Sequence, residues 1–265
     1  MESATPSKLT APPDRLPLLT KLVYGTGDWS MASFNTIRQI FYAIFLTDVV
    51  GLPPALASFA ALIGILWDAI NDPIIGNLSD HIQTRWGRRR PFLLIFSIPF
   101  GAAFILLWWA PPWTTQLTLM IHVTLAYMLA DTLQTLVVVP FLTLTPELTE
   151  DYDERTSLTT YRMLFNLLAS LAAAAGAPEI VASFPNPRQG YLAMSTIFGT
   201  LGAIPFLGIF LITRERFATH PTQPQPIIPA LQAAWDNVPF RIATGLNLLN
   251  WVTFDLVALM LPYFI

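Results

Sequence analysis

The sequence predicts an all-α integral membrane protein that crosses a bilayer several times. Of its 265 residues, 54% are hydrophobic and 12% are charged, whereas soluble globular domains carry about 25% charged residues. Asp131 is the only charge between Pro91 and Pro146, and none lies between Gln189 and Thr213. A helix of roughly 20 apolar residues crosses the bilayer core, so both windows predict membrane spans. This composition excludes a water-soluble enzyme, a nucleic-acid binder and a disordered chain.

Seven segments have the length and composition of spanning helices. A helix is required because every backbone polar group in lipid needs an internal partner. The first segment follows a polar, proline-containing tail at residues 1–20, which lacks the apolar core of a signal peptide. Tryptophans that are typical of a membrane interface flank the turn between the third and fourth segments. The seven predicted helices cover residues 22–47, 53–78, 91–110, 113–145, 157–181, 189–213 and 240–265.

The predicted helices divide the chain into two parts. Residues 21–213 form a six-helix transmembrane unit, and residues 214–239, with the proline-rich stretch 219–229, form a predicted cytoplasmic linker. Residues 240–265 form a seventh helix that stops without a flanking polar residue. Six helices, a linker and one lone helix are an unusual complement, so we expect the chain to be the first part of a longer protein, cut near its seventh helix.

The basic residues predict the orientation. If the N-terminus is cytoplasmic, the outer loops hold only Arg188. Such a bias follows the positive-inside rule, and it predicts a multi-pass protein of the cell (inner) membrane. The cytoplasmic side then holds Lys8, Arg15, Lys21, Arg85, Arg88, Arg89, Arg90, Arg155, Arg214, Arg216 and Arg241.

Five ionisable residues lie near the middle of the predicted spans: Asp28, Arg38, Asp68, Asp72 and Asp131. A charge at a helix centre costs about 2.5–3.5 kcal/mol on insertion scales, and such residues often mark an ion or substrate path. Counting 1.5 Å per residue, Arg38 can reach Asp131 or Asp68. Asp28 and Asp72 share a depth, so they could share a cation or a proton if their helices face each other.

The second predicted helix carries the densest group of polar residues. Asp68, Asn71 and Asp72 stand at positions i, i+3 and i+4, on one face of the helix. Their oxygen atoms suit Na⁺ or H⁺ rather than soft metals. The alternative is that Asp68 and Asp72 only satisfy neighbouring helices. Trp67 is a candidate to stack on a sugar ring.

The loop after this helix is strongly basic. At the least it anchors the cytoplasmic side, and its charges could also pair across helix ends and latch one conformation. The candidate latch residues are Gly76, Asp80, Arg85, Gly87, Arg88 and Arg89.

Two motifs carry a family resemblance. Residues 67–76 read WDAINDPIIG and residues 85–91 read RWGRRRP, and together they resemble the glycoside–pentoside–hexuronide:cation symporters, a branch of the major facilitator superfamily. Residues 21–25 and 47–52 also agree. The resemblance implies a twelve-helix fold of two halves, of which this chain would be the N-terminal six-helix half plus the first helix of the second half.

The resemblance also implies site residues. Asp68, Asn71 and Asp72 match the family's cation positions on the second helix, with Asp68 and Asp72 as ligands if the ion is Na⁺, and Thr135 matches one on the fourth. Arg162 lies near a sugar-site arginine of the family.

Two positions depart from the melibiose permeases of this family. Val138 stands where they carry a fourth-helix aspartate, and Ala32 stands where they carry a sugar-contacting aspartate. Asp131 lies two turns before Val138 and could replace the missing carboxylate. The basic loop is similar to proton-coupled members, which favours H⁺.

The sequence therefore predicts symport of a sugar or glycoside with H⁺ or Na⁺ by alternating access. The protein is expected not to be an enzyme and to need no cofactor beyond the coupling ion. Its expected partners are a small sugar or glycoside, the lipid bilayer and a C-terminal half. The alternatives are symport of a lipid or other organic solute, and a truncated half that does not transport. The candidate substrate-binding residues are Asp28, Arg38, Trp67, Asp131 and Arg162.

Overall fold

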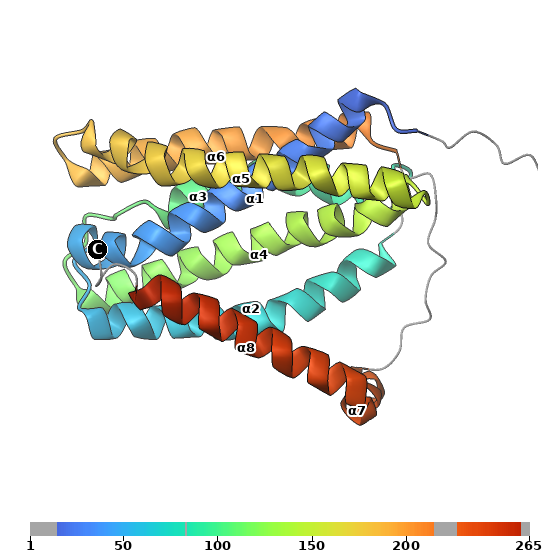
Figure 1. Ribbon diagram of the computed structural model, residues 1–265. Coiled ribbons are helices and arrows are strands. Elements are labelled where there is room, and N and C mark those ends of the chain that lie inside the picture. Colours follow the sequence, from blue (N-terminus) through green and yellow to red (C-terminus); the bar gives the residue numbers. More distant parts are fainter. Residues whose placement is uncertain (1–14, 83, 215–226, 261–265) are drawn as a thin grey trace, which may run out of the picture. The chain divides into compact units, whose positions relative to one another are not determined.

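The computed structural model describes residues 15–82, 84–214 and 227–260 (Figure 1). The chain forms two compact units, one up to Thr219 and one from His220 onward. The last residues of the predicted seventh helix, 261–265, and much of the predicted linker lie outside the described residues.

Six long helices make up the first unit, as predicted. Helix α1 continues into a short π-helical segment, η1. The second unit contains α7 (Ile227–Asp236), which falls within the predicted linker, and α8 (Val238–Met260). The elements of the first unit are α1 (Leu18–Ile44), η1 (Phe45–Val49), α2 (Pro54–His81), α3 (Arg90–Leu107), α4 (Gln116–Leu148), α5 (Tyr152–Ala182) and α6 (Pro187–Ile212).

Prolines and capping side chains at the first positions explain where several helices begin. Helices α2, α3 and α6 have a proline at one of their first two positions, where the missing N–H costs nothing. Helix α5 begins five residues before its predicted start, because the Asp151 carboxylate accepts a hydrogen bond from the Glu154 backbone N–H at 2.9 Å. Helix α1 begins at Leu18, inside the predicted tail, and the Leu16 N–H donates to Glu154 at 3.0 Å.

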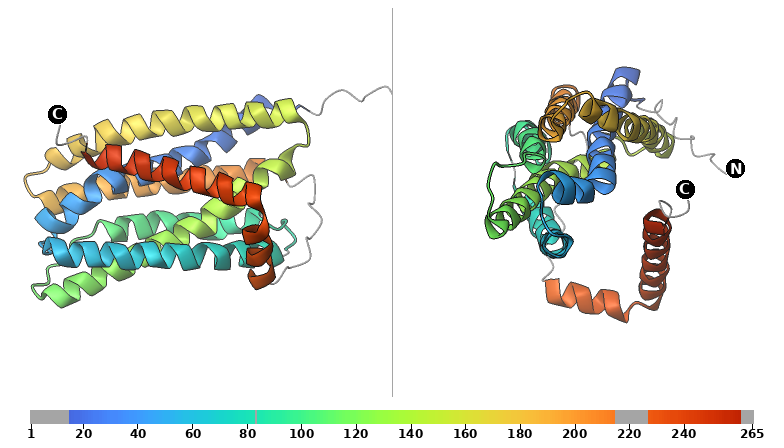
Figure 2. Two further views of the ribbon diagram at one scale, coloured as in Figure 1. Left: turned by 60° about the horizontal axis from the view of Figure 1, so that its bottom comes forward. Right: turned by 90° about the vertical axis from the view of Figure 1, so that its left-hand side faces the viewer.

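The six helices of the first unit form an arc in which each helix packs against the next: α5, α1, α6, α3, α4 and α2 (Figure 2). The two end helices are the least covered, with 22% of the apolar window buried in α2 and 17% in α5, against 50% in α3. An aromatic core fills the inside of the arc, where Phe34 stacks on Phe104 and Phe100. Helices α3 and α6 cross closely, since a Cβ atom on Gly199 would lie 2.7 Å from the Gly101 carbonyl oxygen.

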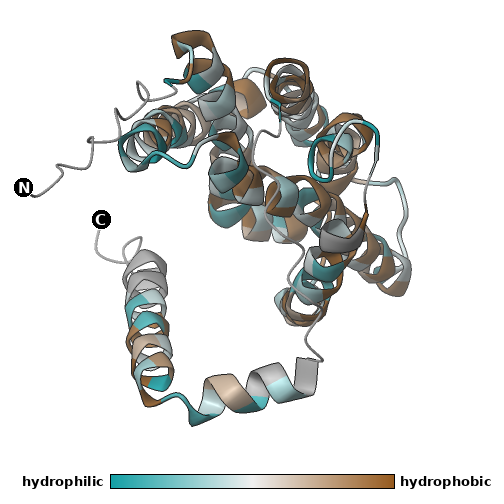
Figure 3. Ribbon diagram, turned by 90° about the vertical axis from the view of Figure 1, so that its right-hand side faces the viewer, coloured by the Kyte–Doolittle hydropathy of each residue, from teal (hydrophilic) through white to brown (hydrophobic). Residues whose placement is uncertain are grey.

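Length and composition identify five helices of the described chain, α2 to α6, as able to cross a membrane. In Figure 3, where the ribbon is coloured by hydropathy, hydrophobic residues make up much of the first unit. Helix α1 was predicted to span but is not among them. It carries three charges, and each one is paired within the unit, so the helix does not present them to lipid. The pairs are Lys21–Glu154 at 2.9 Å, Asp28–Arg162 at 2.5 Å and Arg38–Asp131 at 3.8 Å.

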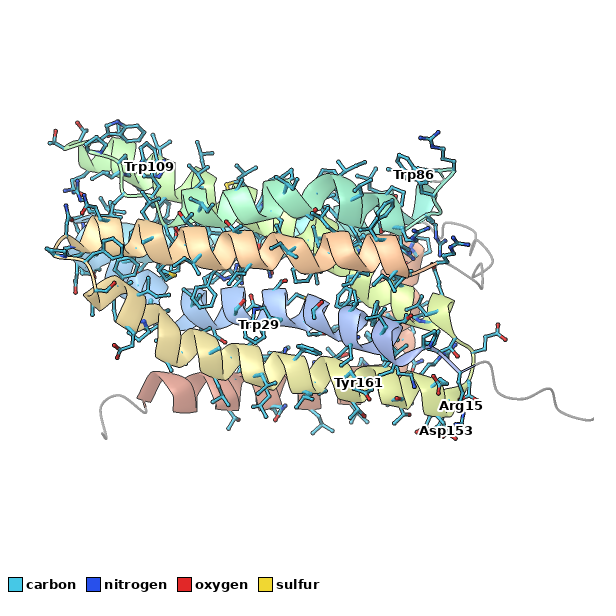
Figure 4. All side chains as sticks on the ribbon, turned by 90° about the horizontal axis from the view of Figure 1, so that it is seen from above. Arg15, Trp29, Trp86, Trp109, Asp153 and Tyr161 are labelled. Atoms are coloured by element: carbon cyan, nitrogen blue, oxygen red, sulfur yellow. The ribbon has the colours of Figure 1, made fainter. Side chains whose placement is uncertain are left out.

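The two ends of the first unit differ in chemistry. Figure 4 shows Trp109 at one end and Arg15, Trp86 and Asp153 at the other. We call the latter the arginine-loop end, after the basic loop of residues 82–89 that joins α2 to α3. The site residues lie between these two ends, on α1, α2, α4 and α5.

Candidate functional site

Side chains of α2 and α4 meet along a line that we call the α2–α4 seam. The Trp67 indole N–H donates to the Thr132 hydroxyl at 2.9 Å, and the Thr135 hydroxyl donates to the Asp72 carboxylate at 2.9 Å. The seam therefore joins Asp72 and Thr135, two of the residues predicted to bind the cation. Both contacts lie inside apolar helices, where a polar side chain needs a partner.

Asp131 and Asp68 face each other in the middle of this seam. Asp131 is 4% exposed, and its carboxylate interacts with those of Asp68 and Asp72 and with the Arg38 guanidinium. Arg38 Nη1 lies 3.8 Å from Asp131 Oδ1, which confirms the predicted contact between the two residues. Among the described residues, Asp131 Oδ2 is buried without a hydrogen-bond partner.

The three residues of the predicted polar face of α2 differ in their exposure. Asp68 and Asp72 are exposed on the open side of the helix, whereas Asn71 is 5% exposed. Asn71 Nδ2 is buried without a partner in the part of the chain described. That part also contains no group of three acidic, histidine or cysteine side chains placed to hold a metal.

A second polar group, which we call the Asp28 cluster, joins α1, α4 and α5. Arg162 Nε and Nη2 donate to the two Asp28 oxygens at 2.5 and 3.2 Å, a bidentate pair. Arg162 also lies 3.5 Å from the Thr145 hydroxyl, with its guanidinium 4.9 Å from the Phe141 ring centroid. Tyr24 is fully buried and donates to the Phe141 carbonyl at 2.6 Å. The structure thus brings two predicted substrate-binding residues, Asp28 and Arg162, into direct contact.

Asp28 and Asp72 belong to two different polar clusters. Asp28 is held by Arg162 and Asp72 by Thr135, so the two carboxylates have different partners. Sequence reasoning placed both at one depth but had no information on which helices are neighbours. It also missed the roles of Tyr24 and Thr145, because a hydroxyl inside a span carries no charge penalty that would draw notice.

The basic loop meets the end of α4. Arg88 Nη2 donates to Glu147 Oε1 at 2.7 Å, and Arg89 lies 3.6 Å from the same oxygen. Arg89 also donates to the Ser79 hydroxyl at 3.0 Å. Glu147 was not predicted as a latch residue, although a carboxylate at this end of a span is a recognisable signal for pairing with a basic loop.

The other predicted latch residues have different surroundings. The Asp80 side chain lies outside the described residues. Arg85 is exposed and stacks on its neighbour Trp86, with 4.5 Å between the guanidinium and the ring centroid. Gly87 has φ of 107°, a backbone conformation that favours glycine in the tight turn of the loop. A Cβ atom added at Gly76 would meet no neighbouring atom within 4 Å, so packing does not require glycine there.

Replacing Glu147 with Gln should destabilise the arginine-loop end. The side chain is 3% exposed, and the substitution removes the negative charge that Arg88 and Arg89 share. Breaking a buried ion pair from one side costs about 3–5 kcal/mol, so we expect the free energy of unfolding in micelles to fall by about 3 kcal/mol. Arg188→Gln, at an exposed residue of the opposite end, should change it by less than about 0.5 kcal/mol. Equal values for the two variants would refute the contact.

Comparisons with known proteins agree with this architecture. A family profile described as MFS/sugar transport protein matches residues 23–265. The chain is 35% identical to a protein of Synechocystis named as an uncharacterized symporter, over 94% of this chain and 47% of the relative. It is 26% identical to the isoprimeverose transporter of Lactiplantibacillus pentosus, over 94% and 53%. It is 33% identical to the sodium-dependent lysophosphatidylcholine symporter 1 of Gallus gallus, over 66% and 33%. The chain spans about half the length of the first two relatives.

Proposed function

The chain belongs to the MFS/sugar transport protein family, as its resemblance to the glycoside–pentoside–hexuronide:cation symporters predicted, and from this premise we propose that it takes part in cation-coupled symport of a sugar or glycoside. The observation that carries the proposal is the α2–α4 seam. There Asp72 contacts Thr135 and Asp68 faces Asp131 inside helices that are otherwise apolar. Charged groups kept at this depth are costly unless they serve an ion or substrate path.

The coupling ion, H⁺ or Na⁺, is cargo in this proposal and binds at Asp68 and Asp72, with Thr135 and Asn71 nearby. Binding of the ion lowers the net negative charge of the seam. This change favours substrate binding and permits the rocking of the two halves of the transporter. The contacts between the basic loop at the arginine-loop end and Glu147 stabilise one of the two conformations.

The substrate contacts in this proposal come from both clusters. The planar guanidinium of Arg162 and the Asp28 carboxylate present donors and acceptors that match vicinal sugar hydroxyls. Trp67 is half-buried and its indole N–H is fixed by Thr132, so its ring offers an oriented apolar surface for a pyranose. The ion pair between Arg38 of α1 and Asp131 of α4 adds a further charged contact for the substrate.

The remaining partners are the bilayer and a second transmembrane half. In this proposal the arginine-loop end is cytoplasmic in the cell (inner) membrane, in line with the positive-inside rule. Helices α2 and α5 end the arc of the first unit and have the lowest burial. Their apolar faces are the proposed surface for the second half, with the substrate between the two halves.

Uptake by the complete protein in proteoliposomes tests this function. Labelled saccharides and glycosides, among them an α-xylosyl-glucose disaccharide, are offered with a Na⁺ gradient or a pH gradient applied separately. We expect accumulation of at least one sugar under one gradient and none when an ionophore removes that gradient. Sugar uptake that ignores both gradients would exclude symport.

A lipid substrate is the second candidate, because one relative at 33% identity is named as a sodium-dependent lysophosphatidylcholine symporter. The same vesicles, offered a labelled lysophospholipid in the presence and absence of Na⁺, distinguish the two substrate classes. Gradient-driven uptake of the lysophospholipid without any sugar uptake would replace the sugar proposal. The absence of uptake of either class by the complete protein would contradict both transport proposals.

A further inference from the structure

Two hydroxyl groups connect the Asp28 cluster to the backbone of α4. The Tyr24 hydroxyl donates to the Phe141 carbonyl at 2.6 Å and lies 2.8 Å from the Thr145 hydroxyl. A tyrosine hydroxyl has one hydrogen to donate, so Thr145 is the donor in the second contact. The Thr145 oxygen lies 3.5 Å from Arg162 Nη1, which can only donate. The hydrogen bonds therefore run in one direction, from Arg162 through Thr145 and Tyr24 to the α4 backbone.

These contacts cross the inside of the arc of helices. Tyr24 lies on α1 and Arg162 on α5, and these two helices pack mainly against each other and against α6, whereas α4 packs mainly against α2 and α3. Tyr24 is fully buried, and the centroid of its ring lies 4.8 Å from that of Phe141. A buried hydrogen-bonding group is costly to leave without its partner. The position of this part of α4 therefore depends on Tyr24 and Arg162.

The part of α4 that receives these contacts lies between two prolines. Pro140 and Pro146 both stand inside the helix, and each lacks the N–H that would donate to the carbonyl four residues earlier. Kinks in helices are concentrated at such positions. Residues 140–146 can therefore tilt as a short segment against the rest of α4. We call them the proline-bounded segment.

Glu147 follows the proline-bounded segment directly. Its carboxylate accepts a hydrogen bond from Arg88 at 2.7 Å and lies 3.6 Å from Arg89. One short stretch of α4 thus carries both Thr145, which contacts the Asp28 cluster, and Glu147, which contacts the basic loop. A tilt of this stretch that follows a change at the Asp28 cluster also moves Glu147.

We propose that Tyr24 is a positioning residue that couples the Asp28 cluster to the contact between Glu147 and the basic loop. The proline-bounded segment transmits the coupling. A sugar that accepts hydrogen bonds from Arg162 draws the guanidinium away from Thr145, which loosens the segment and with it the Glu147 contact. The inference rests on the proposed function, in which Asp28 and Arg162 bind substrate and the basic loop stabilises one conformation.

The labelling rate of a buried cysteine tests the coupling without any substrate. Thr149, at the end of α4, is 3% exposed, and the 265 residues contain no cysteine. The reporter is Thr149→Cys in the complete protein in detergent, with any cysteine beyond these residues replaced by Ser. Tyr24→Phe should raise the rate of its modification by a maleimide by about tenfold, because the arginine-loop end opens more often.

A second substitution shows whether both sites act through one segment. Glu147→Gln should raise the labelling rate at least as much as Tyr24→Phe does. The double variant should be labelled no faster than Glu147→Gln alone, because Tyr24 acts through the Glu147 contact. Tyr42→Phe is the matched control, since Tyr42 is another buried tyrosine of α1 and packs on Trp108. It should leave the rate unchanged.

Substitutions of Thr145 test the coupling from the α4 side. Thr145→Val should reproduce the effect of Tyr24→Phe on the labelling rate, and Thr145→Ser, which keeps the hydroxyl, should restore the rate of wild type. If Tyr24→Phe does not fold, this pair of variants decides alone.

Substrate binding and transport should separate in the Tyr24→Phe variant. Its Kd for a labelled sugar should stay within about threefold of wild type, because Tyr24 is not a proposed substrate contact. The maximal rate of accumulation in proteoliposomes should fall by about tenfold, because substrate binding no longer controls the basic loop. A role in packing alone predicts no such separation.

The outcomes distinguish this coupling from the proposed function. Labelling rates of Tyr24→Phe and Thr145→Val equal to that of wild type would overturn the coupling, and so would effects of Tyr24→Phe and Glu147→Gln that multiply in the double variant. The coupling stands, and the substrate proposal fails, if the labelling rates behave as expected while vesicles take up no solute. Gradient-driven sugar uptake with unchanged labelling in every variant leaves symport standing without the coupling.

Discussion

Replacing Asp72 with Asn is expected to abolish gradient-driven accumulation of substrate. Asparagine keeps the size of the side chain and an oxygen for the Thr135 hydroxyl, which lies 2.9 Å away. It removes the negative charge that would attract the coupling ion. Because the proposed site loses one of its two α2 carboxylates, the cation concentration for half-maximal uptake should rise by about 100-fold or more.

The measurement is uptake into proteoliposomes at a series of Na⁺ concentrations and of pH gradients. Asp48→Asn is the matched control, because it makes the same chemical change at an exposed position outside the seam. Exchange of labelled for unlabelled substrate at equal concentrations on both sides should survive in Asp72→Asn better than accumulation does. Normal accumulation in this variant, with an unchanged cation dependence, would remove Asp72 from the site.

Replacing Asp28 with Asn is expected to cause the largest loss of stability. Asp28 is 6% exposed, and both of its oxygens accept hydrogen bonds from Arg162, whose side chain is 16% exposed. The substitution leaves the guanidinium largely buried without its counter-charge, beside the Thr145 hydroxyl and the Phe141 ring. The free energy of unfolding should therefore fall by about 3–5 kcal/mol.

A double-mutant cycle separates the ion pair from other effects of the substitution. Asp28→Asn and Arg162→Met should each destabilise strongly, whereas the double variant should be more stable than the sum of the two single changes predicts. Denaturant titrations of the purified protein in mixed micelles measure all four free energies. Strict additivity, or an Asp28→Asn variant as stable as Asp48→Asn, would mean that the pair contributes no coupling.

The fold class and the first six helices were predictable because long apolar runs leave little choice in a bilayer. Charged residues are so costly in such runs that each one stands out, and this is how Asp68, Asp72 and Asp131 were found. The contact between Arg38 and Asp131 was also predictable, since the depth of each residue follows from counting along a helix.

Pairing that depends on which helices are neighbours was not predictable in the same way. Asp28 was matched in depth with Asp72, yet α1 packs mainly against α5 and α6, and α2 packs against α4. Asp28 therefore meets Arg162 instead. Glu147 escaped notice for a related reason: its importance arises from the approach of the basic loop to the end of α4, at 2.7 Å from Arg88.

The sequence by itself determined that this is a helical membrane protein of the major facilitator type and which residues carry charge into the membrane. Composition and periodicity are properties of single segments, so they can be read without knowing the contacts. Only the tertiary structure decided that Asp68 interacts with Asp131, that Thr135 donates to Asp72 and that Asn71 is buried while its neighbour Asp72 is exposed. These facts depend on the rotation of α2 against α4, which is set by the packing of many side chains together and by no single motif.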